Sequence, residues 1–215
     1  MIAAVFDVDR TLLPGASTEQ QFMLYLLRHG QIGPGRIARA VFDVARRYPE
    51  LRKRGYLEYH GYLAGRREAD VAEWARDCFV RQILPRLSGA GEARVAEHRA
   101  LGHLTILLSG SISPLIRLLG DHLEVDYVVA TELEIVDGVY TGRLVGKHVA
   151  AEQKAHLVGE LATRHGFDLR ESYCYADHRS DLAMLEQFGN PRPTNPDRGL
   201  LSAAVERGWK VEHFR

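Results

Sequence analysis

The amino-terminal residues constrain the fold more than any other stretch of the chain. Residues 2–6 form a continuous apolar run, which ends abruptly in Asp7-Val8-Asp9. A run of this kind is typical of a short strand that is buried on both faces, as the strands of parallel sheets are. Ligands of open α/β sheets bind at the carboxyl ends of the strands, so we expect both carboxylates at such an edge.

Helix and strand patterns alternate along the second half of the chain. The buried strands expected there are 104–108, 127–130 and 173–176, and the expected helices are 91–101, 113–120, 152–165 and 181–187. A Pro-rich turn, a last helix and a last strand ending in 208–211 follow. Such alternation indicates right-handed crossovers and predicts an α/β fold, a doubly wound and mainly parallel sheet. The Asp137-Gly138 pair between two alternating runs in 132–145 predicts a β-hairpin, which would form a flap.

The strand patterns disappear between Ser17 and Pro85. Apolar residues recur there at helical spacing, in the groups Phe22 to Leu26, Ile37 to Val44 and Val71 to Phe79. We therefore expect a core domain made of residues 1–14 and 86–215, interrupted by a helical cap domain of residues 15–85.

Composition excludes several classes of partner. Lys+Arg and Asp+Glu both number 28, so no overall charge favours nucleic acid or an anionic membrane surface. No run approaches the roughly 20 apolar residues of a membrane span, and no stable membrane association is expected. The amino terminus lacks the features of a signal peptide, and Cys78 and Cys174 are too few and too far apart for a disulfide framework. A cytoplasmic location is expected, whereas the sequence sets no oligomeric state.

The first polar motif, Asp7-Val8-Asp9, suits covalent phosphoryl chemistry. Two acids at one sheet edge are costly unless a cation or a reaction uses them. Beside a divalent ion, one carboxylate can attack phosphorus while the other protonates the leaving oxygen and later activates water. The same two residues also suit a turn followed by a helix cap.

Two further motifs are expected beside the same edge. Ser109, Gly110 and Ser111 end the strand 104–108 and precede a helix, so Ser109 and the following amides can bind phosphate oxygens, although an ordinary capping turn has the same composition. Lys154 is one of only four lysines and lies near the start of a helix, where it can neutralise a phosphoryl group and hold Asp7. Lys147, at the end of the hairpin, is the competing lysine.

The last motif is a pair of acids, Asp177 and Asp181, after the strand 173–176. Oxygen ligands of this kind suit Mg²⁺, with one acid in contact with the metal and the other behind it. A strand end and a helix cap are the alternative reading. His178 is expected in a loop at the rim of the site, because no second histidine has metal-ligand spacing with it.

Together the motifs resemble those of the haloacid dehalogenase-like hydrolase superfamily, in the subfamily with a phosphoserine-phosphatase-like helical cap. The resemblance spans nearly the whole chain and includes Tyr140-Thr141-Gly142 in the hairpin and Asn195-Pro196-Asp197 near the end. It implies an aspartyl-phosphate on Asp7, Asp9 as general acid and base, and phosphate binding by Thr11, Ser109, Gly110 and Lys154. It also implies Mg²⁺ held by Asp7, the backbone carbonyl of Asp9 and Asp177, with Asp181 in support.

Departures from the family pattern concern the substrate. Arg10 and His178 replace smaller residues, and Ala16 stands where phosphoserine phosphatases carry a glutamate that reads the amino acid. Glu19 lies nearby at a different spacing, so phosphoserine specificity is not expected. Arg66 and Arg67 could bind an anionic group, but a solvated helix start explains them as well.

The sequence therefore predicts a Mg²⁺-dependent phosphomonoester hydrolase that acts on a small phosphorylated metabolite. The alternatives are a phosphotransferase, a phospholipid head-group phosphatase and a non-catalytic phosphate-binding regulatory protein. Retention of both acids of the first motif together with Lys154 and Asp177 argues against the last alternative.

Overall fold

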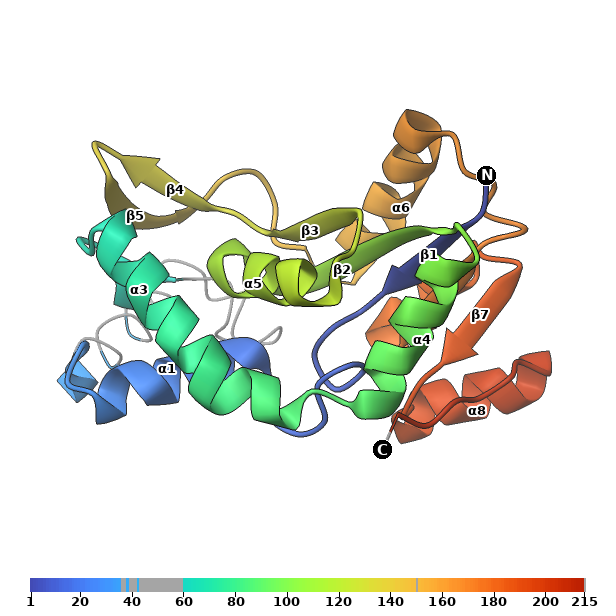
Figure 1. The fold of residues 1–215 in the computed structure, drawn as a ribbon, viewed down its shortest axis with the longest axis horizontal. Helices are drawn as coiled ribbons and strands as arrows, with labels where there is room; N and C mark the ends of the chain where they lie inside the picture. Colours follow the sequence, from blue (N-terminus) through green and yellow to red (C-terminus); the bar gives the residue numbers. More distant parts are fainter. Residues whose placement is uncertain (36–37, 39–41, 43–59, 150, 215) are drawn as a thin grey trace.

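The computed structural model describes residues 1–35, 38, 42, 60–149 and 151–214. A five-stranded sheet with the order β3-β2-β1-β6-β7 lies at its centre, and every neighbouring pair in it is parallel. The strands are β1 (Ala3–Phe6), β2 (Leu104–Ile112), β3 (Tyr127–Thr131), β6 (Tyr173–Ala176) and β7 (Asn190–Pro193). The predicted doubly wound, mainly parallel α/β fold is confirmed (Figure 1).

Helices cover both faces of this sheet because each strand of the centre is apolar on both faces. Ala4 and Phe6 of β1 belong to one buried cluster, and Ala3 and Val5 belong to the other. Helices α4 (Gly89–Ala100) and α5 (Ser113–Leu123) pack on the first face. Helices α6 (Glu152–His165), α7 (Leu182–Leu185) and α8 (Arg198–Arg207) contribute to the cluster on the second.

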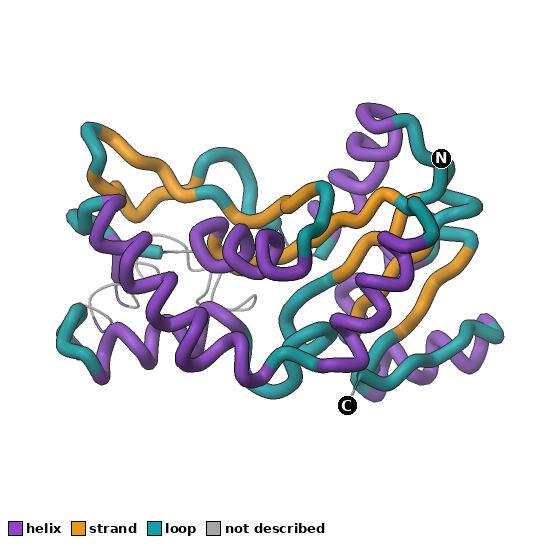
Figure 2. Tube along the Cα trace, in the orientation of Figure 1, coloured by secondary structure: helices purple, strands orange, loops and turns teal. Residues whose placement is uncertain are grey.

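A second group of helices, which we call the cap helices, lies beside the sheet (Figures 1 and 2). It consists of α1 (Thr18–Arg28), the 3₁₀ turn Gly61–Leu63, and α3 (Glu68–Cys78) with its continuation. That continuation is a π turn, Phe79–Ile83, and a 3₁₀ turn, Leu84–Arg86, where Pro85 supplies no backbone N–H. Ile37, Val41 and Val44, on which part of the predicted cap depended, lie outside the described residues.

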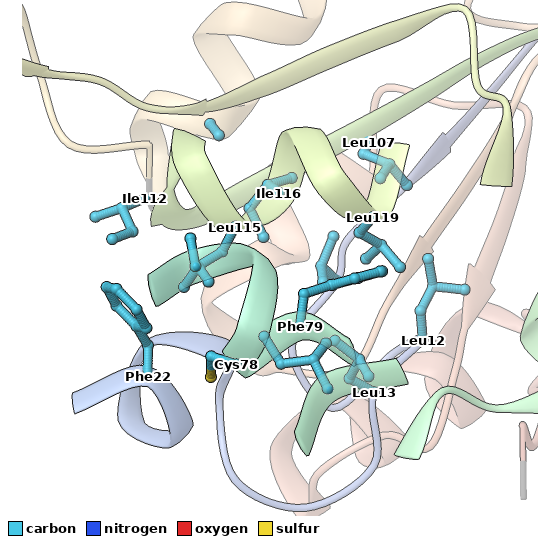
Figure 3. Packing of buried hydrophobic residues seen from close by; sticks show 14 of the residues in the cluster. Leu12, Leu13, Phe22, Cys78, Phe79, Leu107, Ile112, Leu115, Ile116 and Leu119 are labelled. Carbon is cyan, nitrogen blue, oxygen red and sulfur yellow. The ribbon is translucent and has the colours of Figure 1, made fainter. Parts of the chain in front are cut away.

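The cap helices share one hydrophobic cluster with the first face of the sheet. Phe22 of α1 and Cys78 of α3 lie near Leu115 and Ile116 of α5, with Phe79 beside Leu119 (Figure 3). Both cysteines are buried thiols. Continuous apolar packing therefore fixes α1 relative to the carboxyl ends of the strands.

The predicted hairpin is confirmed as β4 (Leu133–Val136) and β5 (Val139–Leu144), joined by Asp137-Gly138. Both turn residues have positive φ, as the tight turn requires. β5 also contacts the segment before α3, since Tyr140 N donates to Arg66 O at 2.8 Å and Gly65 N to Tyr140 O at 2.8 Å. The hairpin and the cap helices thus form one hydrogen-bonded unit.

Three expectations about secondary structure were wrong. The Pro-rich turn is the edge strand β7, where Pro191 and Pro193 are tolerated because an edge strand has only one neighbour to pair with. The last strand, expected to end in 208–211, is reduced to an isolated bridge between Thr194 and Glu212. The strand 104–108 continues to Ile112, so Ser109 lies inside it.

Candidate active site

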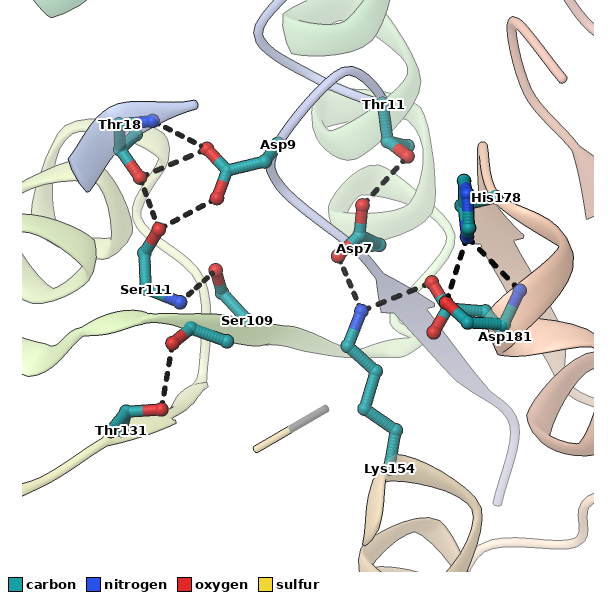
Figure 4. A network of polar contacts seen from close by, with 12 residues as sticks. Asp7, Asp9, Thr11, Thr18, Ser109, Ser111, Thr131, Lys154, His178 and Asp181 are labelled. Atoms are coloured by element: carbon teal, nitrogen blue, oxygen red, sulfur yellow. Dashed lines mark hydrogen bonds and ion pairs between the residues drawn. The ribbon is translucent and has the colours of Figure 1, made fainter. Parts of the chain in front are cut away.

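The candidate site lies where the central strand β1 meets β6. The connections that follow these two strands run to opposite faces of the sheet, which is the point at which α/β proteins bind ligands. Asp7 follows β1 directly, and its backbone N–H donates to Tyr175 O of β6 at 2.9 Å. Its Oδ2 accepts a hydrogen bond from Thr11 Oγ1 at 2.9 Å (Figure 4).

The loop after Asp7 is held by a remote residue. Arg10 adopts a left-handed conformation with φ 66°, which is uncommon for a residue with a side chain. Asn195 Nδ2 donates to the carbonyls of Arg10 and Thr11 at 3.1 and 3.3 Å. The far end of the chain therefore stabilises the first motif.

Lys154 reaches Asp7 from the second layer of helices. Its Nζ lies 2.5 Å from Asp7 Oδ1 and 3.1 Å from Asp181 Oδ2, and all three side chains are buried. Burial opposes the charged form of Lys154, but the carboxylates of Asp7 and Asp181 outweigh it and raise the pKa of Lys154 above its ordinary value. Lys154 is therefore a fixed cation, whereas the competing Lys147 is exposed.

Asp177 completes an acidic cluster at this point. Carboxylate oxygens of Asp7, Asp177 and Asp181 all lie within 4.8 Å of one another. Burial, together with the charges of Asp7 and Asp181, raises the pKa of Asp177 to about 7. Asp181 does not cap α7 through its side chain, since that carboxylate contacts Lys154 instead.

Asp9 points away from this cluster and toward the cap helices. Its Oδ1 accepts from Thr18 N at 2.7 Å and from Thr18 Oγ1 at 2.9 Å, and its Oδ2 accepts from Ser111 Oγ at 2.6 Å. Burial raises the pKa of Asp9, although the hydrogen bonds from Ser111 and Thr18 oppose that change. The two acids of the first motif thus lie in different surroundings.

Ser109 and Gly110 lie in the last part of β2 rather than in a turn before a helix. Ser109 Oγ accepts from Ser111 N at 3.1 Å, and Gly110 O accepts from Thr131 Oγ1 at 2.7 Å. A side chain at Gly110 would place its Cβ 3.0 Å from Val149 O. A side chain here would therefore require a small shift of the backbone segment that passes close by.

Two of the three residues that depart from the family pattern, Arg10 and His178, lie at the rim. His178 is exposed, accepts a hydrogen bond from Ser180 N at 3.1 Å through Nδ1, and has Nε2 3.3 Å from Asp197 Oδ2. The side chain of Arg10 is exposed, and its positive charge acts to lower the pKa of Asp177, against the effect of burial.

Ala16 is exposed, whereas Glu19 is buried in the first turn of α1. Tyr62 Oη donates to Glu19 Oε1 at 2.9 Å, and His60 Nε2 lies 2.8 Å from the same oxygen. Of the two cap arginines, Arg67 is exposed at the start of α3, while Arg66 donates to Gln31 O at 2.6 Å.

Thr18 is the site residue that the sequence did not reveal, and Ser111 was named without a role. The signal that was available is the capping box of Ser17 and Gln20, which fixes the start of α1. A capping box locates a helix end but does not say which side chain of the first turn faces a distant acid.

Comparisons with known proteins identify relatives of this chain. The profile of the haloacid dehalogenase-like hydrolases matches residues 4–186. A Streptomyces azureus protein named for inhibition of morphological differentiation is 31% identical over 99% of this chain and 78% of its own length. A probable phosphatase of Mycobacterium tuberculosis is 30% identical over 99% of this chain and 75% of its own.

Among solved structures, a Bordetella pertussis protein of unknown function superposes with a TM-score of 0.86. It is 30% identical, and the match covers 99% of this chain and 98% of that one. The profile match over most of the chain and the similarity to relatives at 30% identity or more confirm the resemblance inferred from the motifs: the chain belongs to the haloacid dehalogenase-like hydrolase family.

Proposed function

We propose that this protein is a Mg²⁺-dependent phosphomonoesterase that acts on a small phosphorylated metabolite through an aspartyl-phosphate, an acyl phosphate on Asp7. The observation that carries the proposal is the pairing of Asp7 with the buried Lys154 beside two further carboxylates. A relative named as a probable phosphatase supports the same class of reaction. None of the helices in the described part of the chain has the length and apolar character that crossing a bilayer requires.

The acidic cluster fits a hard divalent cation. Three buried carboxylates lie beside one ammonium group, and burial together with the charges of Asp7 and Asp181 raises the pKa of Asp177. Oxygen donors are the ligands that Mg²⁺ prefers. Asp7, the backbone carbonyl of Asp9 and Asp177 would hold the ion, with Asp181 behind them, and when bound it would supply positive charge to the phosphoryl oxygens.

In the first step a carboxylate oxygen of Asp7 attacks phosphorus. The bond from phosphorus to the leaving oxygen breaks, and that oxygen takes a proton from the carboxyl group of Asp9. The burial that raises the pKa of Asp9 favours its protonated form before this step. Lys154 and Thr11 hold the Asp7 carboxylate in one orientation, which lowers the entropy lost on reaching the transition state.

In the second step a water molecule gives a proton to the Asp9 carboxylate and attacks the phosphorus of the acyl phosphate. The bond between phosphorus and Asp7 breaks, inorganic phosphate leaves, and both acids return to their first state. The cap helices would exclude other water while the acyl phosphate on Asp7 exists, since Thr18 of α1 already contacts Asp9.

Phosphate release across a panel of phosphorylated metabolites, with and without Mg²⁺, tests the proposal. The wild-type protein is compared with Asp7→Asn and with Asp121→Asn, which changes an exposed aspartate on α5. We expect release that needs Mg²⁺, falls by at least about a hundredfold in Asp7→Asn, and is unchanged in Asp121→Asn.

Undiminished release by a clean preparation of Asp7→Asn would contradict the assignment of the nucleophile. No release by the wild-type protein from any compound would favour transfer of the phosphoryl group to an acceptor alcohol, or a binding role without turnover.

A further inference from the structure

The carboxyl group of Asp9 is enclosed by residues from two separate parts of the fold. Thr18 begins α1 of the cap helices, and Ser111 lies near the end of β2, 102 positions after Asp9. Thr18 contributes both its N–H and its hydroxyl to Oδ1, while Ser111 contributes its hydroxyl to Oδ2 (Figure 4). Both residues are buried.

The two hydroxyls also contact each other, since Thr18 Oγ1 lies 2.6 Å from Ser111 Oγ. The side-chain oxygens therefore form a closed ring of three contacts, from Asp9 to Thr18, from Thr18 to Ser111 and from Ser111 back to Asp9. Both oxygens of the Asp9 carboxyl group are therefore held by hydroxyls that also support each other.

We propose that Thr18 and Ser111 are positioning residues that hold the carboxyl group of Asp9 in the orientation from which it protonates the leaving oxygen. The inference rests on the proposed function and deepens it. Because Thr18 belongs to α1 and Ser111 to β2, the orientation of the acid depends on the placement of the cap helices against the sheet. Neither residue touches the phosphoryl group in this role.

The role predicts a dependence on the leaving group. When the bond between phosphorus and oxygen breaks, a poor leaving group such as an alkoxide or unsubstituted phenolate needs the proton of Asp9, whereas the stabilised 4-nitrophenolate can leave without it. A loss of positioning therefore slows phenyl phosphate or an alkyl phosphate and spares 4-nitrophenyl phosphate. A general loss of structure slows both kinds of ester equally.

The test measures kcat and KM for phenyl phosphate and 4-nitrophenyl phosphate with the wild-type protein, Thr18→Val and Ser111→Ala. Thr18→Val keeps the backbone N–H and the branched shape but removes the hydroxyl. Thr18→Ser should restore activity, and Thr163→Val, on the exposed face of α6, is the matched control. The value of kcat/KM reports the steps up to formation of the acyl phosphate on Asp7, and it does not depend on the rate at which that intermediate is hydrolysed.

We expect kcat/KM for phenyl phosphate to fall about 10- to 100-fold in Thr18→Val and Ser111→Ala, with KM nearly unchanged. For 4-nitrophenyl phosphate the fall should be less than about threefold. Equal losses on the two esters, or no loss on phenyl phosphate, would overturn the positioning role while leaving the phosphatase proposal intact. If Thr18→Val fails to fold, Ser111→Ala decides alone. Failure of the wild-type protein to release phosphate from either ester would instead overturn the proposed function and, with it, this inference.

Discussion

The Nζ of Lys154 lies 2.5 Å from Oδ1 of Asp7, although 147 positions separate the two residues in the sequence. The contact joins the central strand to the helix layer on the second face of the sheet. It places a permanent positive charge beside the proposed nucleophile, and it gives the first prediction.

Replacement of Lys154 by methionine should remove most of the activity. The variant keeps the length of the side chain but leaves the Asp7 carboxylate without its buried cation, so phosphoryl charge is no longer balanced. We expect kcat/KM to fall by about 10² to 10³. Lys147→Met, at an exposed position, is the control and should retain full activity. Retained activity in Lys154→Met would show that the lysine serves the fold alone.

Asp177 should make the metal-free protein less stable as pH rises from about 4 to about 7. Burial and the neighbouring acids raise the folded pKa of Asp177 to about 7, whereas the unfolded value is near 4. Between these values the folded state binds more protons than the unfolded state, so the free energy of unfolding falls with rising pH. Asp177→Asn lacks this change and should be more stable than the wild type by about 1 to 3 kcal/mol at pH 7.

Urea unfolding with a chelator present, repeated at several pH values, measures this difference. Added Mg²⁺ should reverse the order, because an ion that binds only the folded wild type raises its stability. If the wild type and Asp177→Asn were equally stable at pH 7 without metal, the result would contradict the raised pKa of Asp177.

His98 should produce a pH dependence of opposite sign. It lies on the buried face of α4, with Nδ1 2.8 Å from His103 Nδ1 and Nε2 2.8 Å from Tyr175 Oη. Burial, with the nearby positive charges, lowers its pKa to about 4, whereas an unfolded histidine titrates near 6.5. Between these values the unfolded state binds the extra proton, so stability falls as pH falls from about 6.5 to about 4.

The contribution of His98 should amount to about 1 to 3 kcal/mol over that interval. His98→Gln should flatten this part of the curve, apart from any constant loss of packing, and His213→Gln, at an exposed position, should not. The comparison uses the slope of the free energy of unfolding against pH. An unchanged slope in His98→Gln would mean that other groups produce it.

Gly110→Ala should destabilise the protein by about 1 to 2 kcal/mol and reduce activity. The added Cβ would lie 3.0 Å from Val149 O, and relief of that contact shifts the end of β2 where Ser109 and Ser111 lie. Gly159→Ala is a control of opposite sign, because this helical position in α6 has no atom within 4 Å of the added Cβ. That variant should gain about 0.5 to 1 kcal/mol. Thermal and urea unfolding measure both values.

The sequence predicted the elements whose patterns are local. The apolar run of β1, the alternating hairpin and the helix that carries Lys154 all appear where their periodicity placed them. The edge strand β7 was missed because its sequence, Asn-Pro-Arg-Pro, has the composition of a turn and pairs with β6 through tertiary context alone. The extension of β2 through Ser109-Gly110-Ser111 was missed because small polar residues usually end strands.

The candidate site, like the fold, could be predicted from the sequence only in part. The motifs that end strands could be assigned to one sheet edge, because parallel strands bring their carboxyl ends together. The contacts of Asp9 could not be predicted from the sequence, since Thr18 approaches Asp9 through the packing of α1 against the sheet. Side-chain partners that come from a separate helix layer have no fixed spacing in the sequence.

The backbone pairing of β5 with the segment before α3 also bears on how new specificities can be built on this scaffold. Tyr140 exchanges two main-chain hydrogen bonds with Gly65 and Arg66, and Glu68 N donates to Gly138 O at 2.9 Å. These bonds do not depend on side chains, so they can form even when the sequences of both segments change. A chimera that grafts the equivalent of residues 61–86 from one relative onto the sheet and hairpin of another can therefore keep this pairing, because main-chain groups of the hairpin form it whatever its side chains are.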